Sequence, residues 1–219
     1  MAAEDHMNRS AMEEGFYSMK PKDDLDSLYT SGRLPKILKR TLEGPFSWQR
    51  RNETTLERTL NMPGLAPQWV AGLLAGGAMV HLSGKDIPLV EVLQMSTKQS
   101  FQDVRLPVDG LCWGAAQVAR TPGDEPIVFA IATVKMSKGV VWQAQAALTG
   151  VWPSSVGMIN AANALAGGPL TVERIAEVAA KVADEVDPRG DFLGSADYRR
   201  AMSVVLTRHA LEMCLEGMN

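Results

Sequence analysis

The stretch Asp191–Glu212, DFLGSADYRRAMSVVLTRHALE, decides the fold of the C-terminal part of the chain. Ser195 is a good helix N-cap, because its hydroxyl can accept a hydrogen bond from a backbone N–H one turn later. Apolar residues then recur at three- and four-residue spacing, with Arg199, Arg200, Ser203 and Thr207 between them: Tyr198, Ala201, Met202, Val205, Leu206, His209 and Met213. The stretch predicts a terminal helix that buries Val205 and Leu206 and exposes Arg199 and Arg200.

Two strands are predicted upstream of this helix. Ile127–Met136 and Val140–Thr149 are apolar or alternating, and the turn residues Ser137-Lys138-Gly139 join them into an antiparallel hairpin. Short helices are expected at Met158–Leu165 and, capped by Thr171, at Val172–Val186. The fold class is therefore α+β, with an antiparallel sheet backed by helices.

The chain divides into three predicted regions. Residues 1–31 are polar and lack periodicity, which is typical of an arm that is disordered or orders on a partner. Residues 32–100 hold a helix over Pro67–Leu74, a bend at Ala75–Ala78 and a strand over Ala78–Leu82. The larger α+β domain is expected over residues 101–219.

Composition excludes several classes of function. A formal net charge of −3 and a pI near 5.7 argue against a general nucleic-acid binder. No secretory signal is recognisable, and the longest apolar run, Val70–Val80, is too short to span a bilayer, so we expect a cytoplasmic protein. Cys112 and Cys214 favour free thiols and are too few to hold an iron–sulfur cluster.

No catalytic or metal-binding constellation is visible. The three histidines, His6, His81 and His209, show no ligand spacing. The acidic residues Asp184, Glu185, Asp187 and Asp191 favour a solvated turn over a carboxylate site. An aromatic patch of Trp113, Trp142 and Trp152 favours core or interface packing over ligand stacking.

The order of residues in the terminal helix resembles one family. Gly194-Ser195 followed by Tyr198-Arg199, Leu206, Arg208 and Ala210-Leu211 is similar to its pattern G-S-x-x-Y-R-x-x-x-x-x-x-L-x-R-x-A-L. The family is the flavin-binding medium subunit of molybdenum hydroxylases, which includes xanthine dehydrogenase-like and aerobic carbon monoxide dehydrogenase-like enzymes. Val104–Pro107 is similar to the I-R-L-P that opens its C-terminal domain. The resemblance covers about residues 45–212, and it implies that residues 32–100 are a remnant of the flavin-binding domain.

A second segment, Ser47–Leu60, resembles the family's S-x-Q-x-R-N-x-G-T-I-G-G-N-L, which lies against FAD. Ser47, Gln49, Arg51, Asn52, Thr55 and Leu60 match this pattern. Glu57 and Arg58 replace its paired glycines, and these side chains obstruct the close approach of a pyrophosphate to backbone N–H groups. The family's other glycine turn, A-G-G-T-[DN]-L, has no counterpart in the 46 residues before Ser47.

The resemblance implies a large molybdopterin subunit and a small [2Fe–2S] subunit as partners, with possible self-association. We expect a truncated, degenerate medium subunit that binds no cofactor, has no catalytic residue and holds such an oxidoreductase complex together. In one alternative the chain still binds FAD through Arg51, Asn52, Thr55 and Arg58 and transfers electrons. In another, the C-terminal domain has been reused as an interaction module in an unrelated assembly.

Overall fold

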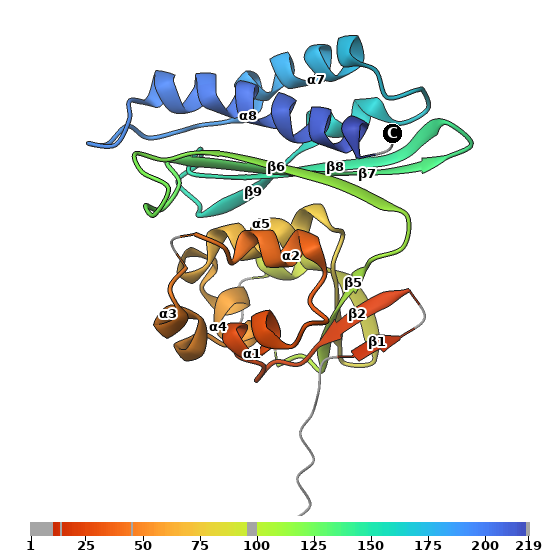
Figure 1. The fold of residues 1–219 in the computed structure, drawn as a ribbon, viewed down its shortest axis with the longest axis vertical. Coiled ribbons are helices and arrows are strands. Elements are labelled where there is room, and N and C mark those ends of the chain that lie inside the picture. Colours follow the sequence, from red (N-terminus) through yellow and green to blue (C-terminus); the bar gives the residue numbers. More distant parts are fainter. Residues whose placement is uncertain (1–10, 14, 45, 96–99, 218–219) are drawn as a thin grey trace, which may run out of the picture.

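The computed structural model describes residues 11–13, 15–44, 46–95 and 100–217, which fold around two antiparallel sheets (Figure 1). The first sheet is N-terminal and has the strand order β1-β2-β5-β3-β4. Its strands are β1 (Ala11–Glu13), β2 (Phe16–Met19), β3 (Met79–Leu82), β4 (Lys85–Pro88) and β5 (Asp103–Pro107). Short helices surround it: α1 (Leu25–Thr30), α2 (Lys36–Thr41), α3 (Trp48–Glu53), α4 (Leu56–Asn61), η1 (Pro63–Leu65), α5 (Pro67–Ala75) and α6 (Leu89–Gln94).

The second sheet is C-terminal and has the order β6-β7-β8-β9. Its strands are β6 (Leu111–Val118), β7 (Val128–Ser137), β8 (Val140–Thr149) and β9 (Val156–Ile159). The 3₁₀ helix η2 (Asn160–Leu165) and the helices α7 (Val172–Glu185) and α8 (Ala196–Glu216) follow. The predicted α+β class is confirmed, and so is the hairpin, because Ala132 pairs with Ala146 and Ser137 with Val140.

The C-terminal sheet is covered on both faces. Figure 1 shows α7 and α8 on one side and the N-terminal helices α2 and α5 on the other. Accordingly, alternate residues of β7 belong to two different cores: Phe129 and Ile131 to the N-terminal one, Val128 and Ala130 to the one beneath α7 and α8. Burial on both faces explains why β7 reads as a continuous apolar run rather than an alternating one.

The predicted polar arm over residues 1–31 is not what the described residues form. Strand β2 pairs with β5, and Tyr17, Met19, Leu25 and Leu28 are buried in the N-terminal core. The physical reason is that β2 is only four residues long, so its alternation is too short to read, and its partner β5 lies far along the chain. Residues 1–10 of the predicted arm lie outside the described residues.

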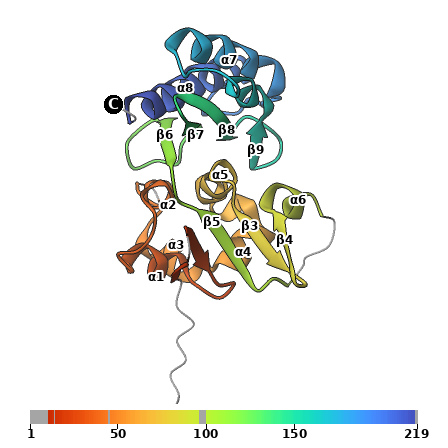
Figure 2. The ribbon, with the colours of Figure 1, turned by 90° about the vertical axis from the view of Figure 1, so that its right-hand side faces the viewer.

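The boundary between the two parts also lies later than the predicted residue 101. Val104 pairs with both Met19 and Val80, so β5 is a central strand of the N-terminal sheet. Figure 2 shows the chain passing from β5 directly into β6 of the second sheet. The C-terminal domain therefore begins close to Leu111.

Helix α8 packs through a different face from the one predicted. Leu206 is buried as expected, but Val205 is 39% exposed, and the buried face includes Arg199, Ser203, Thr207 and Ala210. The cause is close packing on β6: a Cβ added at Gly114 would lie 2.2 Å from the carbonyl oxygen of Ala210. Small side chains on the inner face permit this approach. No helix among the described residues has the length and apolar character needed to cross a membrane.

Candidate functional site

The segment Ser47–Leu60, which resembles the flavin-contacting segment, folds into two short capped helices. The Ser47 hydroxyl accepts a hydrogen bond from the backbone N–H of Arg50 (3.3 Å) at the start of α3. The Thr55 hydroxyl accepts one from the N–H of Arg58 (3.4 Å) at the start of α4. Two of the matching hydroxyls therefore act as helix caps, which accounts for their presence without a ligand.

Arg51 is held within the N-terminal domain by several contacts. Its Nε donates to Asp26 (2.9 Å), its Nη1 donates to the carbonyl of Phe46 (2.7 Å), and its guanidinium lies 4.4 Å from the centre of the Tyr29 ring. Only 16% of its side chain is exposed. Arg51 thus joins α3 to α1, and its charge is already neutralised by Asp26.

The two other predicted flavin contacts lie on the surface. Asn52 is exposed on α3. Arg58 is exposed as well, and its Nη1 donates to the carbonyl of Glu53 (2.6 Å). The four candidate residues therefore share one short segment, but two of them serve its folding and the other two face solvent.

The backbone N–H groups of this segment are occupied by the chain itself. The N–H of Leu56 donates to the carbonyl of Asp23, and that of Glu57 donates to the carbonyl of Pro21, both at 2.9 Å. In return, the N–H of Leu25 donates to the carbonyl of Thr54 (3.0 Å). The stretch 21–25 consists of a turn, the isolated bridge between Asp24 and Thr55 and the first residue of α1, and its carbonyls lie where a phosphate would have to approach these donors.

Charged side chains of both signs surround these donors. Asp23 and Glu57 each contribute one of the paired backbone groups, and the basic residues Lys22 and Arg58 are their neighbours in the sequence. Burial raises the pKa of Asp23. The hydrogen bond that its carboxylate accepts from the N–H of Lys20 (2.7 Å) lowers this pKa, but by less. Because the N–H groups of Leu56 and Glu57 already donate within the chain, the residues present do not fit the pyrophosphate of a dinucleotide.

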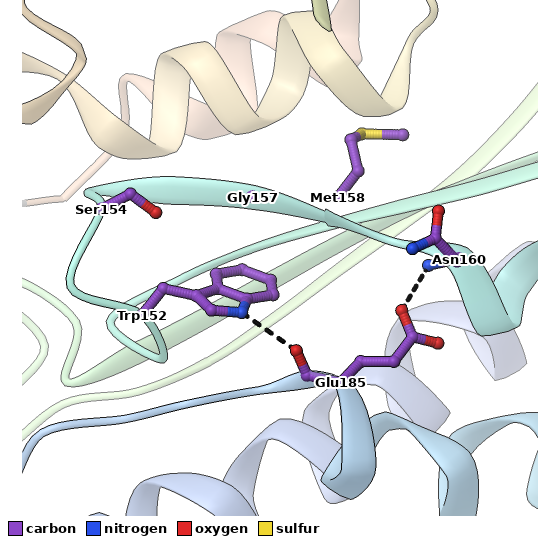
Figure 3. Close-up of a pocket in the computed structure, with 6 residues that line it drawn as sticks. All are labelled: Trp152, Ser154, Gly157, Met158, Asn160 and Glu185. Atoms are coloured by element: carbon purple, nitrogen blue, oxygen red, sulfur yellow. Dashed lines mark hydrogen bonds between the residues drawn. The ribbon is translucent and has the colours of Figure 1, made fainter. Parts of the chain in front are cut away.

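An open hollow of about 390 Å³ lies beside β9 (Figure 3). Glu185 dominates its polar side, but its carboxylate accepts hydrogen bonds from the backbone N–H groups of Asn160 (2.7 Å) and Ala161 (2.6 Å). The Glu185 carbonyl accepts one from Trp152 Nε1 (3.1 Å). This carboxylate is a cap on η2, and the hollow offers no free acid, base or nucleophile.

The tryptophans and the possible metal ligands weighed in the sequence do not form a site among the described residues. Trp113 is half-buried against the N-terminal core, Trp142 is 57% exposed at the hairpin, and Trp152 covers Gly157 beside β9. The described residues contain no group of three or more His, Cys, Asp or Glu that could hold a metal ion. Burial raises the pKa of the Cys214 thiol to about 12, so it carries no thiolate at neutral pH.

Arg199 lies inside the structure and not on the exposed side of α8. Its side chain is 7% exposed; Nη1 donates to the carbonyls of Ile127 (2.7 Å) and Gly150 (2.9 Å), and Nη2 donates to both oxygens of Asp191 (2.8 and 2.7 Å). Ile127 precedes β7 and Gly150 follows β8, where the strand ladder no longer supplies donors. The guanidinium satisfies these carbonyls and ties the loop before α8 to the sheet.

The comparisons with known proteins identify the second half of the chain. Residues 115–214 match the family model of the CO dehydrogenase flavoprotein C-terminal domain. The match covers 100 of the 219 residues, so this part of the chain is similar to that domain. No curated protein matches the chain. The predicted family resemblance is therefore confirmed, and it is carried by the flavoprotein C-terminal domain.

Solved structures extend the similarity of fold to nearly the whole chain. Carbon monoxide dehydrogenase from Hydrogenophaga pseudoflava, in a form that lacks the Mo-pyranopterin moiety of the molybdenum cofactor, is 22% identical with a TM-score of 0.81. The match covers 95% of this chain and 78% of that one. Quinoline 2-oxidoreductase from Pseudomonas putida 86 is 20% identical with a TM-score of 0.78, over 95% of this chain and 78% of that one. Reconstituted CO dehydrogenase from Oligotropha carboxidovorans is 21% identical with a TM-score of 0.78, over 94% and 77%.

The matched residues 115–214 run from within β6 into α8 and include the Arg199 network. The segment Ser47–Leu60 lies outside the matched residues 115–214. The buried Arg199 network explains why the pattern Tyr198-Arg199 marks the terminal helix. The sequence pattern alone predicts Arg199 on the exposed side of this helix. Asp191, eight residues upstream, was the available signal, because a buried arginine requires an acidic partner.

We expect Arg199→Ala to lower the free energy of unfolding by about 3 kcal/mol at neutral pH, because it leaves two carbonyls without donors. The hydrogen bond from Arg199 lowers the pKa of Asp191. A lowered folded-state pKa stabilises the fold above the unfolded pKa, near 4, and this stabilisation is lost as the pH falls through the folded value. The difference in the free energy of unfolding between the native chain and the variant, measured by urea unfolding, should therefore be smaller at pH 3 than at pH 7. An equal difference at both pH values would contradict the role of the ion pair.

Proposed function

We propose that this chain is a flavin-free medium subunit of a molybdenum-hydroxylase-type oxidoreductase complex. Its partners are a large molybdopterin subunit, which performs the chemistry, and a small subunit with [2Fe–2S] clusters. The flavoprotein C-terminal domain and the shared fold support membership of such a complex. We place the complex in the cytoplasm, as the sequence leads us to expect.

The observation that carries the proposal is the use of backbone donors in the segment Ser47–Leu60. FAD is held through its pyrophosphate, which requires backbone N–H groups free to point at phosphate oxygens. Here the N–H groups of Leu56 and Glu57 donate to carbonyls of Asp23 and Pro21, and that of Arg58 donates to the Thr55 hydroxyl. The chain fills its own phosphate-binding position with uncharged acceptors.

The remaining role is structural. Three of the residues weighed as catalytic or ligand-binding candidates are engaged within the fold: Glu185 caps η2, Arg51 pairs with Asp26, and Asp191 pairs with Arg199. A subunit without a redox group can hold its partners together, and it determines which surface of the complex donates electrons to the next acceptor. This role requires large stable interfaces rather than a reactive site.

Co-expression of the three subunits, with and without this chain, tests the proposal. We expect one complex by size-exclusion chromatography that contains molybdenum and iron, and a loss of the association of large and small subunits when the chain is omitted. Independent elution of the chain as a monomer or as a self-associated species would overturn the proposal. Its stable capture in an assembly without molybdenum would instead support a reused interaction module.

A further inference from the structure

We propose that the tip of the β7–β8 hairpin is a docking surface for an acidic segment of a partner subunit. Four residues form this surface, which we call the hairpin surface: Lys135, Lys138, Val140 and Trp142. The partner segment would place a carboxylate at Lys135 and an apolar side chain against Trp142. The inference rests on the proposed function, because the partner is a subunit of that complex.

A β-bulge turns Trp142 toward Lys135. Strands β7 and β8 pair regularly up to Lys135 and Gln143, but the next pair is Met136 with Val141, so Trp142 is an extra residue in β8. A bulge of this kind re-aims a side chain relative to a regular strand. The Lys135 ammonium lies 5.5 Å from the centre of the Trp142 ring.

The two apolar residues of the hairpin surface are exposed. Trp142 is 57% exposed and Val140 is 40% exposed. The helices α7 and α8 do not cover this side, and in Figure 1 the hairpin tip extends past the N-terminal domain, which covers the same face of the sheet nearer its middle. Tryptophan is the residue most enriched among those that dominate binding energy at protein interfaces.

Lys135 has no anionic partner in the described structure. Among the described residues its interaction is with the Trp142 ring, and no ion pair there includes it. The sequence contains no Asp or Glu between Glu125 and Glu173, a range that holds the whole hairpin. Burial lowers the pKa of the Lys135 ammonium. A partly desolvated cation without a counter-ion gains most from an incoming carboxylate.

The charges favour an acidic protein segment over a polyanion. Lys135 and Lys138 are the two cations between Glu125 and Glu173, whereas nucleic-acid surfaces neutralise several phosphates with clustered basic residues. The chain as a whole carries a net charge of −3, which repels an extended polyanion such as nucleic acid or an anionic membrane more strongly than a segment that brings a single carboxylate. A single carboxylate beside an apolar side chain matches the composition of the hairpin surface.

The test measures binding of the full-length chain to an immobilised complex of the large and small subunits. We expect Trp142→Ser to raise the dissociation constant about 30-fold and Lys135→Glu to raise it about 10-fold with a weaker dependence on salt. Two matched controls should change it less than about twofold. They are Trp48→Ser, at a tryptophan 64% exposed on α3, and Lys85→Glu, at an exposed lysine on β4.

The outcomes separate this inference from the proposed function. Native-like binding by Trp142→Ser, or equal weakening by Trp48→Ser, would overturn the docking surface and leave the proposed function standing. Failure of the native chain to bind the two subunits would overturn both. Binding of the chain to vesicles containing phosphatidylserine, lost in Trp142→Ser, would assign the surface to a membrane and overturn the inference. Unchanged circular dichroism and melting temperature of each variant confirm that the fold is intact.

Discussion

Leu206→Asp should lower the free energy of unfolding of the C-terminal domain by about 4 kcal/mol or more, whereas Val205→Asp should lower it by less than about 1 kcal/mol. Leu206 is 6% exposed in the core beneath α8, so the aspartate would bury a charge without a partner. Val205 is 39% exposed on the outer face of the same helix, where a carboxylate stays hydrated. Urea unfolding followed by circular dichroism measures both values.

The two neighbouring positions form a matched pair, because they share a helix, an aliphatic native residue and a substitution. Equal destabilisation by the two variants would show that α8 packs through the apolar stripe read from the sequence. A larger effect of Val205→Asp would show the same. The orientation of α8 given by Arg199, Ser203 and Thr207 would then be rejected.

FAD should bind the chain with an affinity roughly three to six orders of magnitude below that of a flavin-binding relative. The estimate takes the loss of three charge-assisted hydrogen bonds at about 1.5–3 kcal/mol each. These are the donors of Leu56, Glu57 and Arg58, which are engaged within the chain. Isothermal titration of the full-length chain with FAD should show no binding at micromolar concentrations.

Restoring the family's glycines should not restore this affinity. The double variant Glu57→Gly, Arg58→Gly removes both side chains but leaves the carbonyls of Pro21 and Asp23 in front of the donors. Micromolar binding by the double variant would show that the side chains alone exclude the flavin. Micromolar binding by the unaltered chain would contradict the proposed occupation of the donors.

Local signals predicted the central hairpin and the last two helices of the C-terminal domain, but not its outer strands β6 and β9. The hairpin is defined by two strands and the turn at Lys138-Gly139, where both residues have positive φ (51° and 78°). The Thr171 and Ser195 caps mark the starts of α7 and α8. These features depend on residues close in sequence, so the sequence pattern suffices.

Features that depend on distant partners were not predictable from the pattern. The outer face of α8 carries Tyr198, Val205 and Met213, which are larger than the inner Ser203 and Ala210, so periodicity alone selects the wrong side. The inner face of α8 is determined by its close contact with Gly114, a strand residue far upstream, because only small side chains fit at this distance.

In the segment Ser47–Leu60, too, local features could be predicted from the sequence and long-range contacts could not. Its departure from the family pattern at Glu57 and Arg58 was readable from the sequence. The stretch 21–25 that occupies its donors was not, because hydrogen bonds between backbone groups leave no trace in residue identity. That stretch falls in the region predicted as a polar arm.

Flavin content of the assembled complex is the most direct test of the central claim. The three subunits are purified together, denatured, and the released flavin is measured by fluorescence against the amount of this chain. We predict a molar ratio near zero, with molybdenum and iron retained by the partner subunits. A ratio near one flavin per chain would contradict the account and assign to this subunit an electron-transfer role.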